Sequence, residues 1–342
     1  MLRSIIQRSV AALFVVALAV PAVAATQLTG AGSSFDYPFF SKAFYDYSQV
    51  HADVTVNYQS IGSGGGIQQF TAKTVDFGAT DVPMTTEELQ RAKEPVIQVP
   101  IALGGVAISY NLPVQINGGL KLTRAVLADI FLGKITKWND PQVSKLNPGT
   151  ALPDIPIVVA HRSDGSGTTY IFTDFLSHVS PDWKSKVGTG KDVQWPATAS
   201  IGGKGNEGVA GVVKQTPGAI GYVELAYAIE NKMPAAQLQN ASGKYVTCTS
   251  TSVAAAAATK PNVSATDFSI VDAKAANAYP IVGYSWVVLY ENPSDKARAK
   301  LVKDVLEWTA TAGQMVAGTL NYVPLPPSVQ STAKRSLAQI KL

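Results

Sequence analysis

A single arginine lies in a run of small residues that combines a fixed positive charge with a carboxylate and several glycines. The run is His161-Arg162-Ser163-Asp164-Gly165-Ser166-Gly167-Thr168. An apolar segment, 155–160, precedes it, and apolar residues at helical spacing follow it. Glycines at a helix start let backbone N–H groups approach a ligand, and the helix dipole favours an anion there. Arg162 adds a planar charged group suited to an oxyanion. The pattern also fits an ordinary strand–turn–helix joint with Ser166 or Thr168 as N-cap.

Two other turns have the same small, hydroxyl-bearing character. They are Gly30-Ala31-Gly32-Ser33-Ser34-Phe35 and Ile61-Gly62-Ser63-Gly64-Gly65-Gly66. In open α/β sheets, ligands bind at the carboxyl ends of the strands, where such turns lie. Each converging helix N-terminus would contribute roughly 0.3–2 kcal/mol toward an anion. The three turns therefore predict an oxyanion site made of backbone dipoles, hydroxyl groups and one arginine.

Asp81 ends the segment Val75-Asp76-Phe77-Gly78-Ala79-Thr80-Asp81 and is an unexpected residue for such a site. An ionised carboxylate only accepts hydrogen bonds, so it suits an anion that carries a proton. Phosphate keeps a proton near neutral pH and sulfate does not, so a buried Asp81 would select phosphate. The same residue also fits a turn position or an N-cap before Pro83.

Strand-like and helix-like segments alternate, which predicts an α/β protein. We expect strands at 54–58, 75–79, 96–110, 155–160, 218–225 and 281–290, and helices at 67–74, 85–93, 123–131 and 294–312. A chain of 342 residues is longer than a single hydrophobic core usually supports, so two lobes are expected. The long segment 96–110 should leave one lobe and enter the other.

The first 24 residues resemble a secretory signal, with Arg3 and Arg8 before an apolar run and Ala22-Val23-Ala24 as the cleavage site. The mature chain is therefore expected to begin at Ala25. The single cysteine, Cys248, excludes a disulfide within the chain, and no cysteine follows the apolar run to anchor a lipid. A formal net charge of +4 with 15% charged residues does not indicate a nucleic-acid binder.

Four blocks carry a resemblance to a known family: 28–35, 57–66, 75–81 and 162–168, supported by 131–135 with 138–140, 202–208 and 217–224. With these blocks the chain resembles the periplasmic phosphate-binding proteins of the phosphate-specific ABC importer. The resemblance implies a two-lobed clamshell, similar to type II binding proteins, with hinge strands and a dehydrated phosphate between the lobes. Residues 1–24 would be the signal peptide, 25–100 with 279–342 the first lobe, and 101–278 the second.

The resemblance also implies which residues contact phosphate. They are Ser34, Phe35, Ser63, Asp81, Arg162, Ser166, Gly167 and Thr168, with Asp164 holding Arg162. It implies no cofactor, no metal ion and no catalysis. The expected partners are inorganic phosphate and an inner-membrane ABC permease with its cytoplasmic ATPase, and the receptor is expected to be a periplasmic monomer.

Two residues depart from the family pattern. Asp36 stands where relatives commonly have proline, and we expect it to face solvent at the helix start, where the dipole favours it. His161 stands where a second basic residue is usual, and we expect it to flank the site without contacting the ligand. Residues 203–208 match a dinucleotide-binding pattern, but we expect no strand to enter them.

Two other function classes remain open. A secreted phosphatase could use the same anion pocket, but it needs a nucleophile with a base or a metal centre. The three histidines, His51, His161 and His178, lack the spacing of a metal site, and no Gly-x-Ser-x-Gly elbow is present. A receptor for another tetrahedral anion is the other alternative, and Asp81 disfavours sulfate more than arsenate.

Overall fold

A computed structural model describes residues 25–342. The signal-peptide prediction for residues 1–24 lies outside the described residues. Eight strands form a mixed sheet in the order β2-β1-β3-β11-β4-β8-β6-β7. Their bounds are β1 (Thr26–Gly32), β2 (Val54–Ser60), β3 (Phe77–Thr80), β4 (Val96–Tyr110), β6 (Val158–Arg162), β7 (Ser200–Gly203), β8 (Ala219–Glu224) and β11 (Val282–Tyr290). Three short strands, β5 (Lys121–Leu122), β9 (Gln237–Gln239) and β10 (Tyr245–Val246), form a second sheet.

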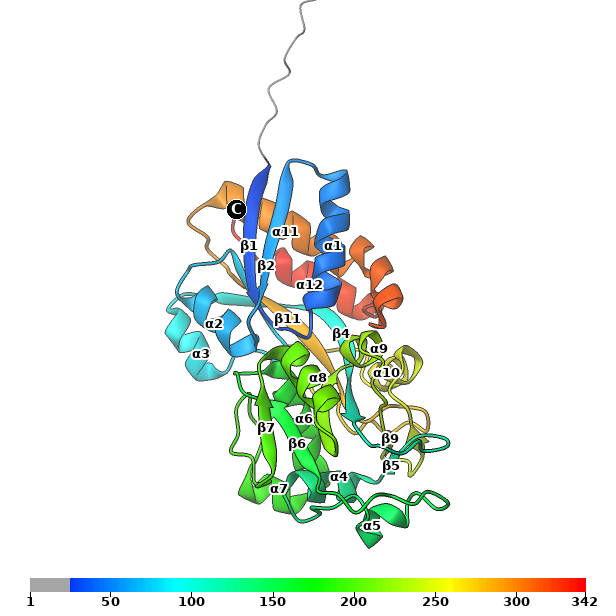
Figure 1. The fold of residues 1–342 in the computed structure, drawn as a ribbon. Helices are drawn as coiled ribbons and strands as arrows, with labels where there is room; N and C mark the ends of the chain where they lie inside the picture. The colour runs from blue at the N-terminus through cyan, green and yellow to red at the C-terminus, as the bar shows by residue number, and fades with distance from the viewer. Residues whose placement is uncertain (1–24) are drawn as a thin grey trace, which may run out of the picture.

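Helices cover this sheet in two lobes (Figure 1). The upper lobe contains β1–β3 with α1 (Tyr37–Val50), α2 (Ser63–Thr71), α3 (Thr86–Ala92), α11 (Lys296–Ala310), the 3-10 helix η1 (Ala312–Leu320) and α12 (Pro327–Leu337). The lower lobe contains β6 and β7 with α4 (Arg124–Phe131), α5 (Pro141–Ser144), α6 (Gly167–Val179), α7 (Pro181–Lys186) and α8 (Gly205–Gln215). The short helices α9 (Leu225–Glu230) and α10 (Ser250–Ala257) lie beside the junction.

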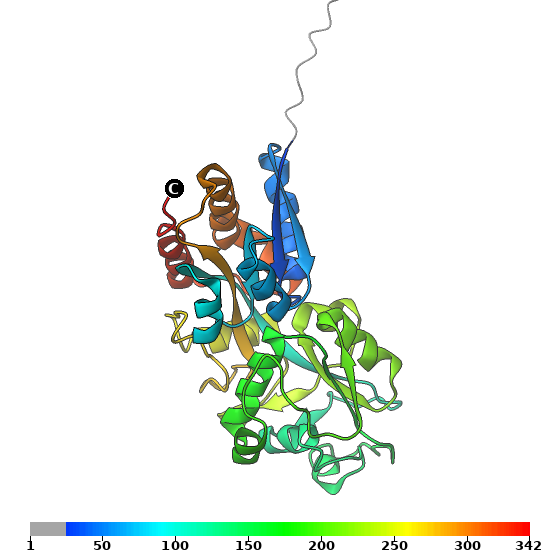
Figure 2. The same cartoon turned by 90° about the vertical axis from the view of Figure 1, so that its left-hand side faces the viewer.

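One strand runs through both lobes, as the sequence predicted. The first part of β4, Val96–Gly105, pairs with β11, and its last part, Val106–Tyr110, pairs with β8. Figure 2 shows β4 descending from the upper to the lower lobe, with the N-terminal and C-terminal segments together above it. Val99–Tyr110 are all buried, which explains the continuous apolar run in the sequence.

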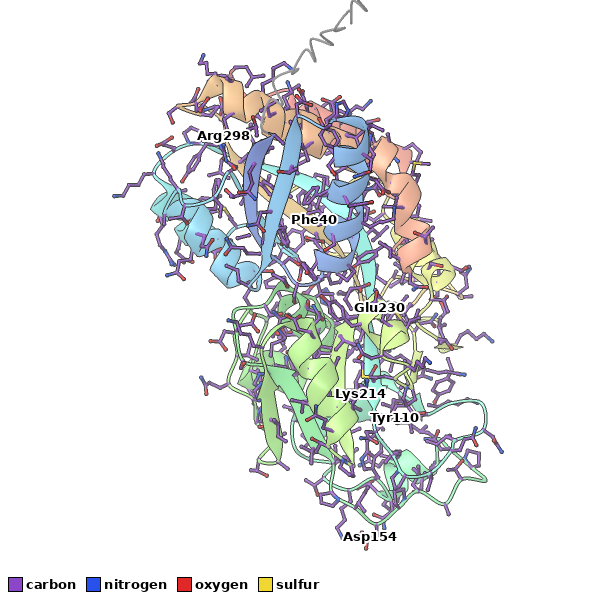
Figure 3. The ribbon with its side chains drawn as sticks, turned by 45° about the horizontal axis from the view of Figure 1, so that its top comes forward. Phe40, Tyr110, Asp154, Lys214, Glu230 and Arg298 are labelled. Atoms are coloured by element: carbon purple, nitrogen blue, oxygen red, sulfur yellow. The ribbon has the colours of Figure 1, made fainter. Side chains whose placement is uncertain are left out.

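An aromatic cluster packs α1 onto the upper sheet. The rings of Phe40 and Phe44 stack with centroids 4.8 Å apart, and Tyr58 of β2 meets Phe40 edge-on at 4.9 Å. Phe40, labelled in Figure 3, is completely buried between helix and strands. Burying one such ring stabilises the fold by about 1.5–3 kcal/mol, so this cluster fixes the position of α1 and of the turn before it.

The N-cap residues recognised in the sequence correctly predicted where two helices begin. Thr85 and Glu88 form the expected capping box of α3, and Thr123 accepts from Val126 N at the start of α4, as expected. The helix expected at 67–74 is shifted and spans Ser63–Thr71 as α2. The shift arises because Gly62, at φ +81°, completes the turn, and Gly66 lets the helix approach β1. A Cβ on Gly66 would lie 2.4 Å from the Cα of Gly32.

The expectation that no strand enters residues 203–208 is wrong. β7 ends at Gly203, pairs in parallel with β6, and α8 begins at Gly205. This strand has only four residues, of which three are glycine or serine, so it carries no hydropathy signal. Among residues 25–342, no helix is both long enough and apolar enough to cross a lipid bilayer.

Candidate functional site

Four turns from the two lobes meet at the lobe junction. From the lower lobe, Gly167 N donates to Ser63 Oγ over 3.0 Å, and Thr168 Oγ1 donates to Asp81 Oδ2 over 3.1 Å. Gly64 N donates to the carbonyl of Gly165 over 2.8 Å, which joins the start of α2 to the turn before α6. The turns that the sequence analysis singled out therefore converge.

Arg162 lies at the end of β6, in line with Asp164 two residues later. Its Nε donates to Asp164 Oδ1 over 2.7 Å and its second terminal nitrogen to Oδ2 over 2.5 Å. The arginine side chain is only 2% exposed. Burial lowers the pKa of the guanidinium, but the hydrogen bonds and charges of its neighbours, Asp164 foremost, together raise the pKa by more than burial lowers it. The pKa is therefore raised overall, and the arginine keeps its charge. Asp164 thus fixes the guanidinium in one orientation, and the N–H groups of Arg162 that do not donate to Asp164 stay available as donors.

A glycine allows the upper lobe to approach this ion pair. Gly62 has φ +81°, and a Cβ there would lie 2.0 Å from Asp164 Oδ2 and 3.2 Å from a terminal nitrogen of Arg162. Any larger residue would push the turn before α2 away from the arginine. The glycine-rich run 62–66 therefore allows the two lobes to approach each other closely at Gly62, and its role there is not flexibility.

Ser166 is the N-cap of α6, which resolves the alternative between Ser166 and Thr168. Its Oγ accepts from Thr169 N over 3.0 Å, and its own N–H donates to the carbonyl of Lys191 over 2.8 Å. The first N–H groups of α6 face the upper lobe, as the Gly167 contact with Ser63 shows. The positive end of the α6 dipole thus points at the lobe junction.

Two serine hydroxyls at the junction are held as acceptors by backbone N–H groups. Ser63 Oγ accepts from Gly167 N and from Asp81 N, the latter over 3.2 Å. Ser34 Oγ accepts from the backbone N of Asn206 over 3.0 Å and from its side-chain amide over 2.9 Å. Because a hydroxyl has two acceptor sites and one hydrogen, each serine is left with its O–H as a donor to a third group.

Asn206 is a site residue that the sequence analysis missed. It lies in the first turn of α8 and bridges Ser34 of the upper lobe and Thr168 of the lower lobe, over 2.9 and 3.2 Å. The signal in the sequence that could have identified it was the pattern at residues 203–208, which marks a strand–turn–helix joint of the same kind as the other three.

Phe35, a predicted site residue, has a completely buried side chain. Its ring packs against Tyr322, and its carbonyl accepts a hydrogen bond from the Tyr322 hydroxyl.

Asp81 is buried and surrounded by hydroxyl groups. Its Oδ1 accepts from Ser33 and from Ser285, the latter over 3.0 Å, while Oδ2 accepts from Thr168. Burial raises the pKa of Asp81, and the Ser33 hydrogen bond and the Arg162 charge partly oppose that rise. Asp81 is therefore a carboxylate acceptor at the junction, not a turn residue facing solvent.

The prediction that Asp36 faces solvent is wrong. Asp36 is 0% exposed, and its Oδ2 lies 2.5 Å from Ser285 Oγ. As the N-cap of α1 it has φ −84° and ψ −14°, and its side chain makes no capping hydrogen bond. A capping side chain usually needs extended backbone at that position, so helical backbone turns this carboxyl inward instead.

The histidine nearest the site does not join it. His161 stacks on Trp195 with ring centroids 5.0 Å apart, and its Nδ1 lies 2.9 Å from the Arg162 carbonyl. Its position agrees with the expected flanking role. Cys248 is buried, and in the described part of the chain no three His, Cys, Asp or Glu side chains gather as metal ligands would.

Comparisons with known proteins agree with one another. A model of the PBP superfamily domain matches residues 19–312. Phosphate-binding protein PstS of Xylella fastidiosa is 48% identical over 305 residues, covering 89% of this chain and 82% of that protein. Phosphate-binding protein PstS of Haemophilus influenzae is 45% identical over 316 residues, covering 92% of this chain and 93% of that protein.

Solved structures share the fold at lower identity. A phosphate-binding protein from Stenotrophomonas maltophilia superposes with a TM-score of 0.66 at 19% identity, over 91% of this chain and 94% of that chain. That likeness supports the two-lobed architecture, while the higher identities above define the closer group. On its sequence and its fold, the chain belongs to the PstS family of phosphate-binding proteins within the PBP superfamily.

Proposed function

We propose that this protein binds inorganic phosphate in the periplasm and delivers it to an ABC importer. The observation that carries the proposal is the meeting of Arg162, Asp81 and two donor-oriented serines with the start of α6 at the lobe junction. A small anion held there would contact both lobes at once. Closure then gains additional free energy when the anion is present, beyond that of the direct contacts between the lobes, which is what a capturing receptor requires.

Each residue has a role that follows from its contacts. The guanidinium of Arg162, oriented by Asp164, supplies the full positive charge. The hydroxyls of Ser34 and Ser63 donate to phosphate oxygens. The Thr168 hydroxyl, which donates to Asp81 Oδ2 in this structure, would exchange that partner for a phosphate oxygen. The Phe35 N–H adds a further donor. The N–H groups of Ser166 and Gly167, which donate to the Lys191 carbonyl and to Ser63 Oγ in this structure, would join the set by exchanging those partners for phosphate. Asp81 accepts the proton that phosphate carries, and a carboxylate facing fully deprotonated sulfate would repel it.

We further propose the wider setting of this receptor. Residues 25–100 with 279–342 would move as one lobe and 101–278 as the other. The chain would act as a monomer after removal of residues 1–24, and it would dock on an inner-membrane permease with its cytoplasmic ATPase. It needs no cofactor for this role.

Binding is favoured over phosphatase chemistry by how the serines are used. Ser63 Oγ accepts from two backbone N–H groups, and Ser166 Oγ caps α6. A nucleophilic serine would instead need a base as the acceptor of its proton. The relatives named above are binding proteins as well.

The test is calorimetric titration of the mature chain with phosphate and with sulfate at several pH values. We expect tight phosphate binding and no competition from sulfate. Arg162→Met should weaken phosphate binding more than Ser63→Ala, because it removes two or more charge-assisted hydrogen bonds of about 1.5–3 kcal/mol each instead of one. The double variant Arg162→Met/Asp164→Asn controls for the carboxylate that Arg162→Met leaves unpaired.

Two outcomes would contradict the proposal. One is a mature chain that shows no heat of binding with phosphate. The other is turnover of a phosphomonoester that disappears in Ser166→Ala, which would favour the phosphatase alternative. Equal losses in Arg162→Met and Ser63→Ala would leave phosphate binding in place but refute the assigned ranking.

A further inference from the structure

Three side chains far apart in the sequence form a row of oxygens behind the proposed phosphate site. Ser285 Oγ lies 2.5 Å from Asp36 Oδ2 and 3.0 Å from Asp81 Oδ1. Asp36 and Ser285 are 0% exposed, and Asp81 is 2% exposed. A buried serine hydroxyl thus stands directly between two buried carboxyl groups.

The number of hydrogens in this row shows that one carboxyl group is protonated. Both distances are those of O–H···O hydrogen bonds, so each contact needs a hydrogen. Ser285 supplies one hydrogen, and an ionised carboxylate supplies none. The third neighbour of Ser285 Oγ, the Thr80 carbonyl at 3.2 Å, is also only an acceptor. The second hydrogen must therefore belong to Asp36 or to Asp81.

The surroundings assign that proton to Asp36. Asp81 receives further hydrogen bonds from Ser33 and Thr168 and lies near the charge of Arg162, all of which stabilise its ionised form. Asp36 Oδ1 has no hydrogen-bond partner. Burial and then the charge of Asp81 raise the pKa of Asp36 well above its usual range.

The other titratable groups facing Asp36 do not favour its ionisation either. Tyr58 of β2 and Glu224 at the end of β8 face it, and burial raises the pKa of both side chains. The Tyr322 hydroxyl donates to the Phe35 carbonyl, and the Tyr227 hydroxyl donates to the Ser34 carbonyl, so both are already engaged. None of these groups is a cation.

We propose that Asp36 is a positioning residue that acts through Ser285 on Asp81. The Asp36 carboxylic acid donates to Ser285, and the Ser285 hydroxyl donates to Asp81 Oδ1. With Ser33 as its second donor, Oδ1 receives two hydrogen bonds that favour the ionised form of Asp81. Oδ2 accepts one hydrogen bond from Thr168 and keeps a second acceptor site for the proton of the bound phosphate. This inference rests on the proposed function and adds that Asp36 and Ser285 share in the discrimination against sulfate.

An irregularity in the sheet places Ser285 in this row. The register of β11 on β4 shifts between Ser285 and Trp286, which face Ala102 and Pro100. Proline offers no N–H to a neighbouring strand, and bulges re-aim side chains beside binding sites. The hydroxyl of a buried central strand is thereby directed at both carboxyl groups.

The experiment compares Asp36→Ala, Asp36→Asn and Ser285→Ala, with Ser109→Ala as the matched control. Ser109 is also a buried serine of a central strand, but its hydroxyl has no partner. Calorimetry with phosphate, and with phosphate in the presence of sulfate, measures affinity and selectivity. Infrared spectroscopy of the ligand-free protein detects the C=O stretch of a protonated carboxylic acid.

We expect Asp36→Ala and Ser285→Ala each to weaken phosphate binding by about 10-fold or more and to admit competition by sulfate. Asp36→Asn should recover most of the affinity that Asp36→Ala loses, because an amide N–H can donate to Ser285 as the acid does. The parent-minus-Asp36→Asn infrared difference spectrum at neutral pH should contain a carboxylic acid band, and Ser109→Ala should bind like the parent.

Three results would overturn the inference. The first is an infrared difference spectrum without a carboxylic acid band. The second is an Asp36→Asn variant that binds phosphate about 10-fold more tightly than the parent, since that would mean an anion had been removed. The third is Asp36→Asn binding as weakly as Asp36→Ala. If the parent itself fails to bind phosphate, the proposed function fails instead, and the infrared result still decides the protonation of Asp36.

Discussion

One ion pair joins the two lobes outside the proposed phosphate contacts, and its removal should change how fast phosphate leaves. Lys191 Nζ, in the loop between α7 and β7, lies 2.6 Å from Glu88 Oε2 and also contacts Oε1. Glu88 is on α3 of the upper lobe, and both side chains are 14% exposed. The change to test is Lys191→Met, which keeps the apolar stem of the side chain. Glu88 is left intact because it also completes the capping box of α3.

The magnitude follows from the burial of the pair. Exposed ion pairs contribute about 0–1 kcal/mol, and breaking a fully buried pair costs about 3–5 kcal/mol. A pair with 14% exposure lies between these limits, so Lys191→Met should cost roughly 1–3 kcal/mol, or about 5- to 150-fold in affinity. Because the pair forms only when the lobes meet, most of this loss should be in the dissociation rate.

Stopped-flow release of phosphate into a trap measures that rate, with Lys186→Met as the control. Lys186 pairs with Asp182 inside the lower lobe and is 61% exposed, so its removal should change release by less than about 2-fold. The Lys191 carbonyl, which accepts from Ser166 N, is unaffected by either change. A release rate of Lys191→Met equal to that of Lys186→Met would refute the reasoning.

Three further changes test other parts of the structure. Asp81→Asn should relax the discrimination against sulfate, because an amide N–H can donate where the carboxylate only accepts; absence of sulfate competition in calorimetry would contradict the acceptor role. Asp36→Asn should gain stability relative to the parent as pH rises from about 4 to 7, because the pKa of Asp36 is raised in the folded state and the unfolded chain releases that proton first; parallel melting curves across this range would contradict it. Asp76→Ala should destabilise the protein to urea by about 1–3 kcal/mol while phosphate affinity changes by less than about 2-fold, since Asp76 joins Thr29 N of β1, at 2.6 Å, to Arg298 of α11 (Figure 3).

Residues close together in the sequence were the ones whose relations could be predicted. The pairing of Arg162 with Asp164 spans two residues, and the Thr85–Glu88 capping box spans three. The continuous apolar run of β4 identified the strand that passes between the lobes. In these cases local spacing and hydropathy determine the structure, because the partners are held together by the same turn or strand.

Contacts across long separations could not be predicted in the same way. Ser285 meets Asp36 across 249 residues, and Asn206 meets Ser34 across 172. Ser285 lies in a strand whose sequence reads as uniformly buried, so nothing local marks its hydroxyl as part of a site. The orientation of Asp36 depends on the backbone angles of one N-cap residue, which neither composition nor periodicity reports.

The chemistry of the site divides affinity from selectivity. Two backbone N–H groups direct the hydroxyl hydrogen of Ser63 outward, and Asn206 does the same for Ser34, so in the proposed site these hydroxyls would donate to any tetrahedral oxyanion. Arg162 and the α6 dipole also respond to charge and not to protonation. In the proposed site, discrimination between phosphate and sulfate would then depend on the acceptor, Asp81, and on the groups that keep that carboxylate ionised. Because Asp36 is the neighbouring carboxyl group, the proposal makes the location of one buried proton decide how well this site would reject an anion of the same shape.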